Sequence, residues 1–224
     1  VSNFPALPLN SKILDLGCGT GKQLFLFYDL CPKDIEWYAL DISRESIETI
    51  KKENKNIKLI CLAFERSEDF FQKRENFFDL IYSCYALYYC QRSYLKKLIS
   101  LIYNSLKDGG IFWVIGPYKG TNKELFEIIE KYYDIPQEVF YSLGDFYLEL
   151  LQHVKSAGFS RFECSFFENK ILFSSANQLF NYWKNTTFYN ENFEKEIKKE
   201  INNSFDKTKT FKLTKMVISY KFYK

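Results

Sequence analysis

Three closely spaced glycines, Gly17, Gly19 and Gly21, follow a short apolar run that contains the acid Asp15. The run predicts a buried strand. The glycines predict a tight turn into a helix, and the free backbone N–H groups of that helix can face an anionic ligand. A dinucleotide-binding turn of the form G-x-G-x-x-G would need its third glycine at position 22, where Lys22 stands. The spacing therefore favours a nucleoside ligand that has no pyrophosphate.

A second apolar run ends in Asp41, about 20 residues beyond the glycine turn. A carboxylate at this place can accept hydrogen bonds from ribose hydroxyls. S-adenosylmethionine carries a ribose and a carboxylate but no pyrophosphate, so the turn and Asp41 together indicate this cofactor. A nicotinamide-dependent oxidoreductase is the alternative, and the glycine spacing disfavours it.

The segment Asp15–Gly21, followed by Asp41, resembles the class I S-adenosylmethionine-dependent methyltransferases. Later segments resemble that family in the expected order: Phe78–Cys84 its fourth strand, Leu106–Gly110 the turn into its fifth, and Ala157–Phe159 the entry to its sixth. The resemblance covers residues 12–173. It implies a methyltransferase that uses S-adenosylmethionine and releases S-adenosylhomocysteine.

The resemblance also implies which residues hold the cofactor. They are Asp15, Gly17, Cys18, Gly19, Thr20, Gly21, Asp41, Ile42, Ala63, Phe64 and Ser83. Family members often carry an acid after the third strand that meets the adenine amino group. This chain has Leu62, Ala63, Phe64 and Glu65 in that stretch, so Glu65 or a backbone carbonyl is the expected substitute.

Short apolar runs alternate with amphipathic stretches, which predicts parallel strands joined by right-handed helical crossovers. The expected fold is α/β, with a doubly wound, mostly parallel, seven-stranded Rossmann-like sheet. We expect strands at 12–16, 35–41, 57–62, 78–84, 111–116, 170–173 and 216–222, the last antiparallel at the sheet edge. Helices are expected at 20–31, 43–54, 91–106 and 122–133, with Ser43 capping the second.

The whole chain, 1–224, is expected to be a single methyltransferase domain. Residues 175–210 lie between strands six and seven, and we expect them to form a helical lid over the acceptor pocket. Only about a dozen residues precede the first strand. We therefore expect that the N-terminal helices common in the family are missing here.

Methyl transfer is an in-line displacement in a water-poor pocket, and it needs neither a metal nor a covalent intermediate. His153 is the only histidine, and it falls on a helix expected away from the acceptor. An acceptor that ionises unaided is therefore favoured, or a carboxylate or tyrosine base. The acceptor-pocket candidates are Tyr85, Tyr89, Lys119, Trp183, Lys184 and Tyr189.

Two lysines in a closed pocket would favour an anionic acceptor, because unpaired charges are costly to desolvate. The stretches Tyr85–Tyr89, Ile115–Pro117 and Tyr182–Tyr189 resemble a bacterial subgroup of small-molecule methyltransferases. This resemblance implies O- or N-methylation of a small polar metabolite, such as an anionic carbohydrate or a phosphate-bearing molecule, in surface-polysaccharide or secondary metabolism. The alternatives are a non-catalytic nucleoside-binding module and an RNA methyltransferase.

Composition limits these alternatives. The chain has 31 basic and 28 acidic residues, a net charge of +3, which is too balanced to indicate a nucleic-acid partner. Six cysteines show neither a C-x-x-C pair nor a metal-binding spacing, so we expect reduced thiols and no metal. No apolar run is long enough to span a membrane and no signal peptide is visible, so a cytoplasmic protein is expected. The oligomeric state stays open.

Overall fold

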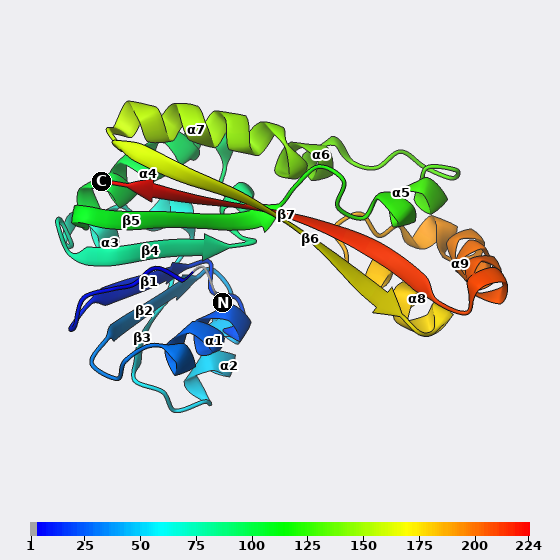
Figure 1. The fold of residues 1–224 in the computed structure, drawn as a ribbon, viewed down its shortest axis with the longest axis horizontal. Helices are drawn as coiled ribbons and strands as arrows, with labels where there is room; N and C mark the ends of the chain where they lie inside the picture. The colour runs from blue at the N-terminus through cyan, green and yellow to red at the C-terminus, as the bar shows by residue number, and fades with distance from the viewer. Residues whose placement is uncertain (1–3) are drawn as a thin grey trace. The chain divides into compact units, whose positions relative to one another are not determined.

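The computed structural model describes residues 4–224, apart from the side chains of residues 206–208. Its strands form a seven-stranded sheet in the order β3-β2-β1-β4-β5-β7-β6 (Figure 1). The strands are β1 (Lys12–Leu16), β2 (Glu36–Asp41), β3 (Ile57–Cys61), β4 (Phe78–Cys84), β5 (Leu106–Pro117), β6 (Arg161–Phe173) and β7 (Phe211–Tyr223). The paired strands from β3 to β5 are parallel. This confirms the predicted α/β fold.

The chain divides into two compact units. The first unit comprises residues 1–116, 148–165 and 219–224, and the second comprises residues 117–147 and 166–218. The prediction that residues 1–224 form one domain stays a prediction.

The first unit is built on the parallel strands. Strand β1 pairs with β2 and β4, and Ile13, Leu14 and Leu16 are fully buried. Since Ile13 and Leu14 point to opposite faces, both faces of β1 are covered. The helices here are α1 (Lys22–Leu30), α2 (Arg44–Lys51), α3 (Glu68–Gln72), α4 (Arg92–Ser105) and most of α7 (Asp145–Ala157). The Ser43 side chain accepts a hydrogen bond of 3.1 Å from the Ser46 N–H, which confirms the predicted cap of α2.

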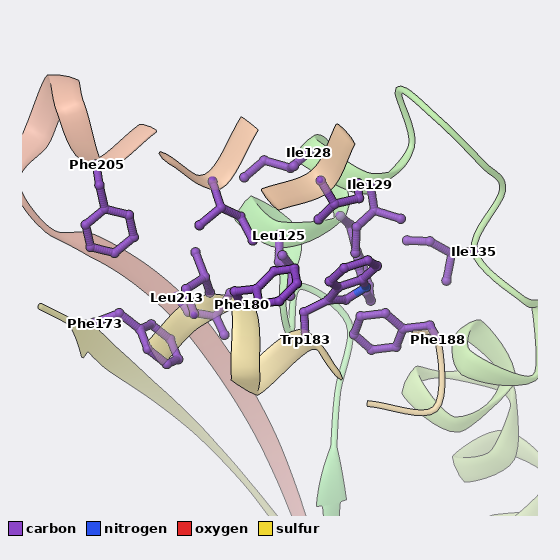
Figure 2. Packing of buried hydrophobic residues seen from close by; sticks show 14 of the residues in the cluster. Leu125, Ile128, Ile129, Ile135, Phe173, Phe180, Trp183, Phe188, Phe205 and Leu213 are labelled. Atoms are coloured by element: carbon purple, nitrogen blue, oxygen red, sulfur yellow. The ribbon is translucent and has the colours of Figure 1, made fainter. Parts of the chain in front are cut away.

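The second unit has a core of its own. Its helices are α5 (Lys123–Ile129), α6 (Gln137–Leu143), α8 (Ala176–Lys184) and α9 (Glu194–Thr208). Figure 2 shows side chains from α5, α8 and β7 packed together, with Trp183 and Leu213 fully buried. The Trp183 indole N–H donates a hydrogen bond of 3.2 Å to the Tyr133 hydroxyl, so this large side chain fixes α8 by both packing and a polar contact.

The sheet differs from the sequence-based predictions in the place of one strand and in the starts of three. The strand β7 lies between β5 and β6, so β6 is the edge strand rather than β7. Strands β5, β6 and β7 begin at Leu106, Arg161 and Phe211, ahead of the expected starts. The added part of β5 is held by the antiparallel end of β7, since Gly109 and Gly110 exchange backbone hydrogen bonds with Lys224.

Candidate functional site

The glycine turn lies between β1 and α1 and is tied to β2. The N–H groups of Gly17 and Cys18 both donate to the Leu40 carbonyl, at 2.7 and 3.1 Å. Gly17 has φ +86°, and a Cβ there would lie 2.3 Å from the Ala86 Cβ. Only glycine allows this approach between the turn and the loop after β4. Gly19 differs, because a Cβ on it would meet nothing within 4 Å.

Asp41 ends β2, and its carboxylate is oriented by backbone donors. One oxygen accepts from the Gly19 N–H at 2.7 Å and the other from the Ser43 N–H at 2.9 Å. Each carboxylate oxygen has about two acceptor positions, so each oxygen retains one for a further donor. Asp41 is therefore a fixed acceptor, suited to a ligand that carries adjacent hydroxyls.

A cavity of about 400 Å³ opens beside this turn, wholly within the first unit. Such a volume suits a small-molecule ligand. Most of its lining is apolar or backbone, and the acids are Asp41 and Glu65. Its lining residues are Gly17, Cys18, Gly19, Asp41, Ile42, Leu62, Ala63, Phe64, Glu65, Cys84, Tyr85, Ala86 and Tyr89.

Apolar side chains and one acid define the wall formed by β2 and the segment after β3. Ile42 is 72% exposed, and both Ile42 and Phe64 line the cavity. Flat apolar surfaces of this kind can cover the two faces of a purine ring. Glu65, also in the lining, accepts a hydrogen bond of 2.9 Å from the Gln91 N–H, which holds its carboxylate in place.

A buried acid lies at the base of the turn. Asp15 is 1% exposed, and it accepts a hydrogen bond of 2.8 Å from the Tyr82 hydroxyl. Its second oxygen and the buried Ser83 hydroxyl have no partner among the described residues. Burial raises the pKa of the Asp15 carboxyl to about 7; the Tyr82 hydrogen bond opposes this shift, and the nearby charge of Asp41 adds to it.

The cysteines at the cavity are not nucleophiles. Burial, with the charge of Asp15, raises the pKa of the Cys18 and Cys84 thiols well above the ordinary range. Both side chains are therefore neutral thiols near neutral pH, and thiolate chemistry is not available to them.

Tyr85 has an unusual backbone for a bulky residue. Its φ is +56°, a left-handed conformation that costs energy outside glycine, and its N–H donates to the Ile115 carbonyl at 2.8 Å. Tyr85 and Tyr89 both line the cavity. The role of these two tyrosines as acceptor-pocket residues stays a prediction.

The structure brings together most of the predicted cofactor residues. Those on the cavity lining are Gly17, Cys18, Gly19, Asp41, Ile42, Ala63 and Phe64. Asp15 and Ser83 are buried, and Thr20 and Gly21 belong to the turn without lining the cavity. Sequence reasoning missed Leu62, Cys84 and Ala86, although all three follow or end a parallel strand, where ligands collect.

The remaining acceptor candidates belong to the second unit. Trp183 is fully buried in that unit's core, while Lys184 donates to Glu194 at 2.8 Å. The Tyr189 hydroxyl donates to the same carboxylate at 2.9 Å. Lys119 is exposed, and its side chain runs past Gly144. The lid role of residues 175–210 stays a prediction.

Neither a metal-binding cluster nor a membrane-spanning helix is found in the described part of the chain. No group of three or more histidine, cysteine, aspartate or glutamate side chains could hold a metal ion among the described residues. Within the same residues, no helix is long and apolar enough to cross a membrane. His153 lies on α7 with its Nε2 atom 3.5 Å from Glu149, and it is not part of the cavity lining.

Comparison with known proteins agrees with this geometry. Residues 13–110 match a family model described as a methyltransferase domain, and this segment contains the glycine turn, Asp41 and every residue that lines the cavity. Over this segment the chain is similar to that methyltransferase domain family, and the comparisons support a class I S-adenosylmethionine-dependent methyltransferase.

Two curated relatives are similar to part of this methyltransferase chain. The carboxy-S-adenosyl-L-methionine synthase of Campylobacter lari is 26% identical over 129 residues, 56% of this chain and 54% of that protein. The ubiquinone/menaquinone biosynthesis C-methyltransferase UbiE of Wigglesworthia glossinidia brevipalpis is 30% identical over 130 residues, 56% of this chain and 49% of that protein. The chain thus spans about half the length of these relatives.

Solved methyltransferase structures share the fold over nearly the whole chain. Phosphoethanolamine N-methyltransferase 2 of Haemonchus contortus has a TM-score of 0.58 at 16% identity, covering 100% of this chain and 51% of that one. The arsenic(III) S-adenosylmethionine methyltransferase of Chlamydomonas reinhardtii has a TM-score of 0.59 at 15% identity, covering 99% and 66%. At these identities the likeness concerns the fold alone.

Proposed function

We propose that the chain binds S-adenosylmethionine in the cavity of the first unit and transfers its methyl group to a small, polar, anionic acceptor. The observation that carries the cofactor assignment is the Asp41 carboxylate, held at the cavity by the N–H groups of Gly19 and Ser43 with acceptor positions to spare. Ribose hydroxyls have the donors that such a carboxylate takes.

The rest of the cavity fits the other parts of this cofactor. Ile42 and Phe64 offer apolar surfaces to the adenine ring, and Glu65 or the Ala63 backbone, on the same cavity lining, is proposed to recognise its amino group. The open space at Gly19 admits a ligand close to the backbone. The unpartnered oxygen of Asp15 supplies a buried acceptor near the turn.

When bound, the cofactor supplies a methyl group activated by a sulfonium. The chain's own residues then have to orient the acceptor and exclude water. Tyr85 and Tyr89 are proposed for this role because they line the same cavity. No histidine lines it, so an acceptor that is already nucleophilic fits best.

The nature of the acceptor is supported by two neighbours in fold. One neighbour structure holds phosphomonomethylethanolamine with S-adenosylhomocysteine, and another is an arsenic(III) methyltransferase. Both are described with small acceptors rather than macromolecules. They support a small-molecule acceptor for this chain, and the phosphorylated ligand of the first supports an anionic one.

Methyl transfer can be tested directly with S-adenosylmethionine labelled in its methyl group. The chain would be incubated with a pool of phosphorylated sugars and amines, and products read by mass spectrometry. We expect a labelled small molecule with wild type and the exposed control Asp108→Asn, and a strongly reduced yield with Asp41→Asn. Label found only in RNA, or cofactor binding with no product, would overturn the proposal in favour of the two alternatives.

A further inference from the structure

Among the described residues of the second unit, the side chain of Lys215 forms hydrogen bonds to neutral oxygens and no ion pair with an acid. Lys215, on β7, donates from its Nζ atom to the Asn122 Oδ1 atom at 3.0 Å and to the Tyr182 hydroxyl at 2.6 Å. The Tyr182 hydroxyl in turn donates to Asn122 at 3.0 Å. Lys215 is partly buried, and both of its oxygen partners are neutral.

Two other lysines of this unit have acidic partners. Lys131 pairs with Glu200 at 3.0 Å, and Lys184 pairs with Glu194 at 2.8 Å. The ion pairs found among the described residues include none with Lys215. The positive charge of Lys215 is thus partly desolvated without a compensating charge, an arrangement that costs free energy unless an anion joins it.

An acid from α5 bonds to the residue that precedes Lys215 on β7. Glu124 accepts from the Thr214 N–H at 2.9 Å and also from the Thr214 hydroxyl. Successive strand residues point to opposite faces of a sheet, so Thr214 and Lys215 face different sides. Glu124 is therefore committed to Thr214 and does not compensate Lys215.

Three separate segments hold the ammonium in place. Asn122 is 6% exposed, with a left-handed φ of +61°, and its N–H donates to the Thr214 carbonyl at 2.8 Å. Tyr182 lies on α8, next to the core residue Trp183, and its ring lies 5.6 Å from the ring of Phe173. A lysine fixed in this way has lost its rotamer freedom before a ligand arrives, which favours binding.

We infer that Lys215, positioned by Tyr182 and Asn122, forms an anion-binding site on the second unit that takes a phosphate monoester. Two of its three N–H donors are engaged by neutral oxygens, and the third can be directed to a phosphate oxygen. Binding of the anion at this site does not depend on the proposed function.

The test is a titration of the full chain with inorganic phosphate and with glycerol 3-phosphate, against chloride at equal ionic strength. Affinity would be read by calorimetry and by chemical-shift changes at the Tyr182, Asn122 and Lys215 amides. We expect at least tenfold weaker binding in Lys215→Met, partial recovery in Lys215→Arg, and no change in Lys212→Met, an exposed lysine on the same strand.

A purely structural cluster would behave differently. In that case Lys215→Met would have a lower melting temperature than wild type but the same phosphate affinity, and that result would overturn the inference. Should Lys215→Met fail to fold, two other measurements decide whether phosphate binds at Lys215. They are the chemical-shift changes of wild type on titration with phosphate and the phosphate affinity of Tyr182→Phe. Wild type that binds S-adenosylhomocysteine but not phosphate counts against this site alone, and wild type that binds phosphate but not S-adenosylhomocysteine counts against the proposed cofactor site alone.

Discussion

At the residue scale, two glycines of one turn have different physical roles. Gly17 is required by packing, because a Cβ there would lie 2.3 Å from the Ala86 Cβ. Gly19 is surrounded by open space at the cavity, so a methyl group there would meet a ligand rather than the protein. A substitution at Gly17 is therefore expected to affect mainly stability, and a substitution at Gly19 mainly ligand binding.

This difference gives the first prediction. Gly17→Ala should lower the free energy of unfolding by about 2–4 kcal/mol, through overpacking added to backbone strain. Gly19→Ala should cost only about 1 kcal/mol, the strain alone, yet weaken ligand binding. Urea denaturation of both variants measures the first effect. Equal destabilisation by the two substitutions would contradict the packing described for Gly17.

Asp15 makes stability depend on pH. Its folded pKa of about 7 exceeds its ordinary unfolded value of about 3.9, so between those values the folded state binds more protons and stability falls as pH rises. Asp15→Asn carries no charge to desolvate. The stability of this variant relative to wild type should therefore improve by about 2–4 kcal/mol between about pH 4 and about pH 8. Denaturation at a series of pH values would reveal it, and a constant difference would exclude a raised pKa.

At the element scale, α8 is held by Trp183. The indole is fully buried and donates to the Tyr133 hydroxyl. These contacts make Trp183 a core residue, whereas the sequence suggested it for the acceptor pocket. The neighbouring Lys184 and Tyr189 share the Glu194 carboxylate, which compensates the charge that had pointed to an anionic acceptor.

Substitution of Trp183 distinguishes the two roles. Trp183→Phe should lower the free energy of unfolding by about 1–3 kcal/mol through lost volume and a lost hydrogen bond. Tyr133→Phe is the control, because it leaves the indole in place and removes this hydrogen bond together with the one that the Tyr133 hydroxyl donates to the Phe188 carbonyl. A stable Trp183→Phe protein with a changed KM for the acceptor would instead assign this side chain to the acceptor pocket.

At the scale of the whole molecule, the sequence predicted the features that depend on residues close together in the chain. The glycine turn and Asp41 were identified because positive φ and an acid at a strand end leave a signal in consecutive residues. The parallel strands were predicted from apolar runs that the sheet buries on both faces. The helix α2 was located by its Ser43 cap.

Long-range pairing left no such signal. The place of β7 inside the sheet depends on contacts with β5 about 100 residues earlier, as between Gly109 and Lys224. The Lys215 cluster joins segments separated by 33 to 93 residues, so no pattern in consecutive residues marks it. The backbone strain at Tyr85 is likewise set by its tertiary surroundings, since its N–H bonds to Ile115 on the neighbouring strand.

The central claim is that the cavity of the first unit holds S-adenosylmethionine through Asp41. Calorimetric titration with S-adenosylhomocysteine, and separately with NAD, tests it on wild type, Asp41→Asn and the exposed control Asp108→Asn. We expect binding of S-adenosylhomocysteine alone, unchanged in the control and weaker by about 1–3 kcal/mol in Asp41→Asn through lost charge-assisted hydrogen bonds. Equal affinity in Asp41→Asn and wild type, or binding of NAD in its place, would contradict the account.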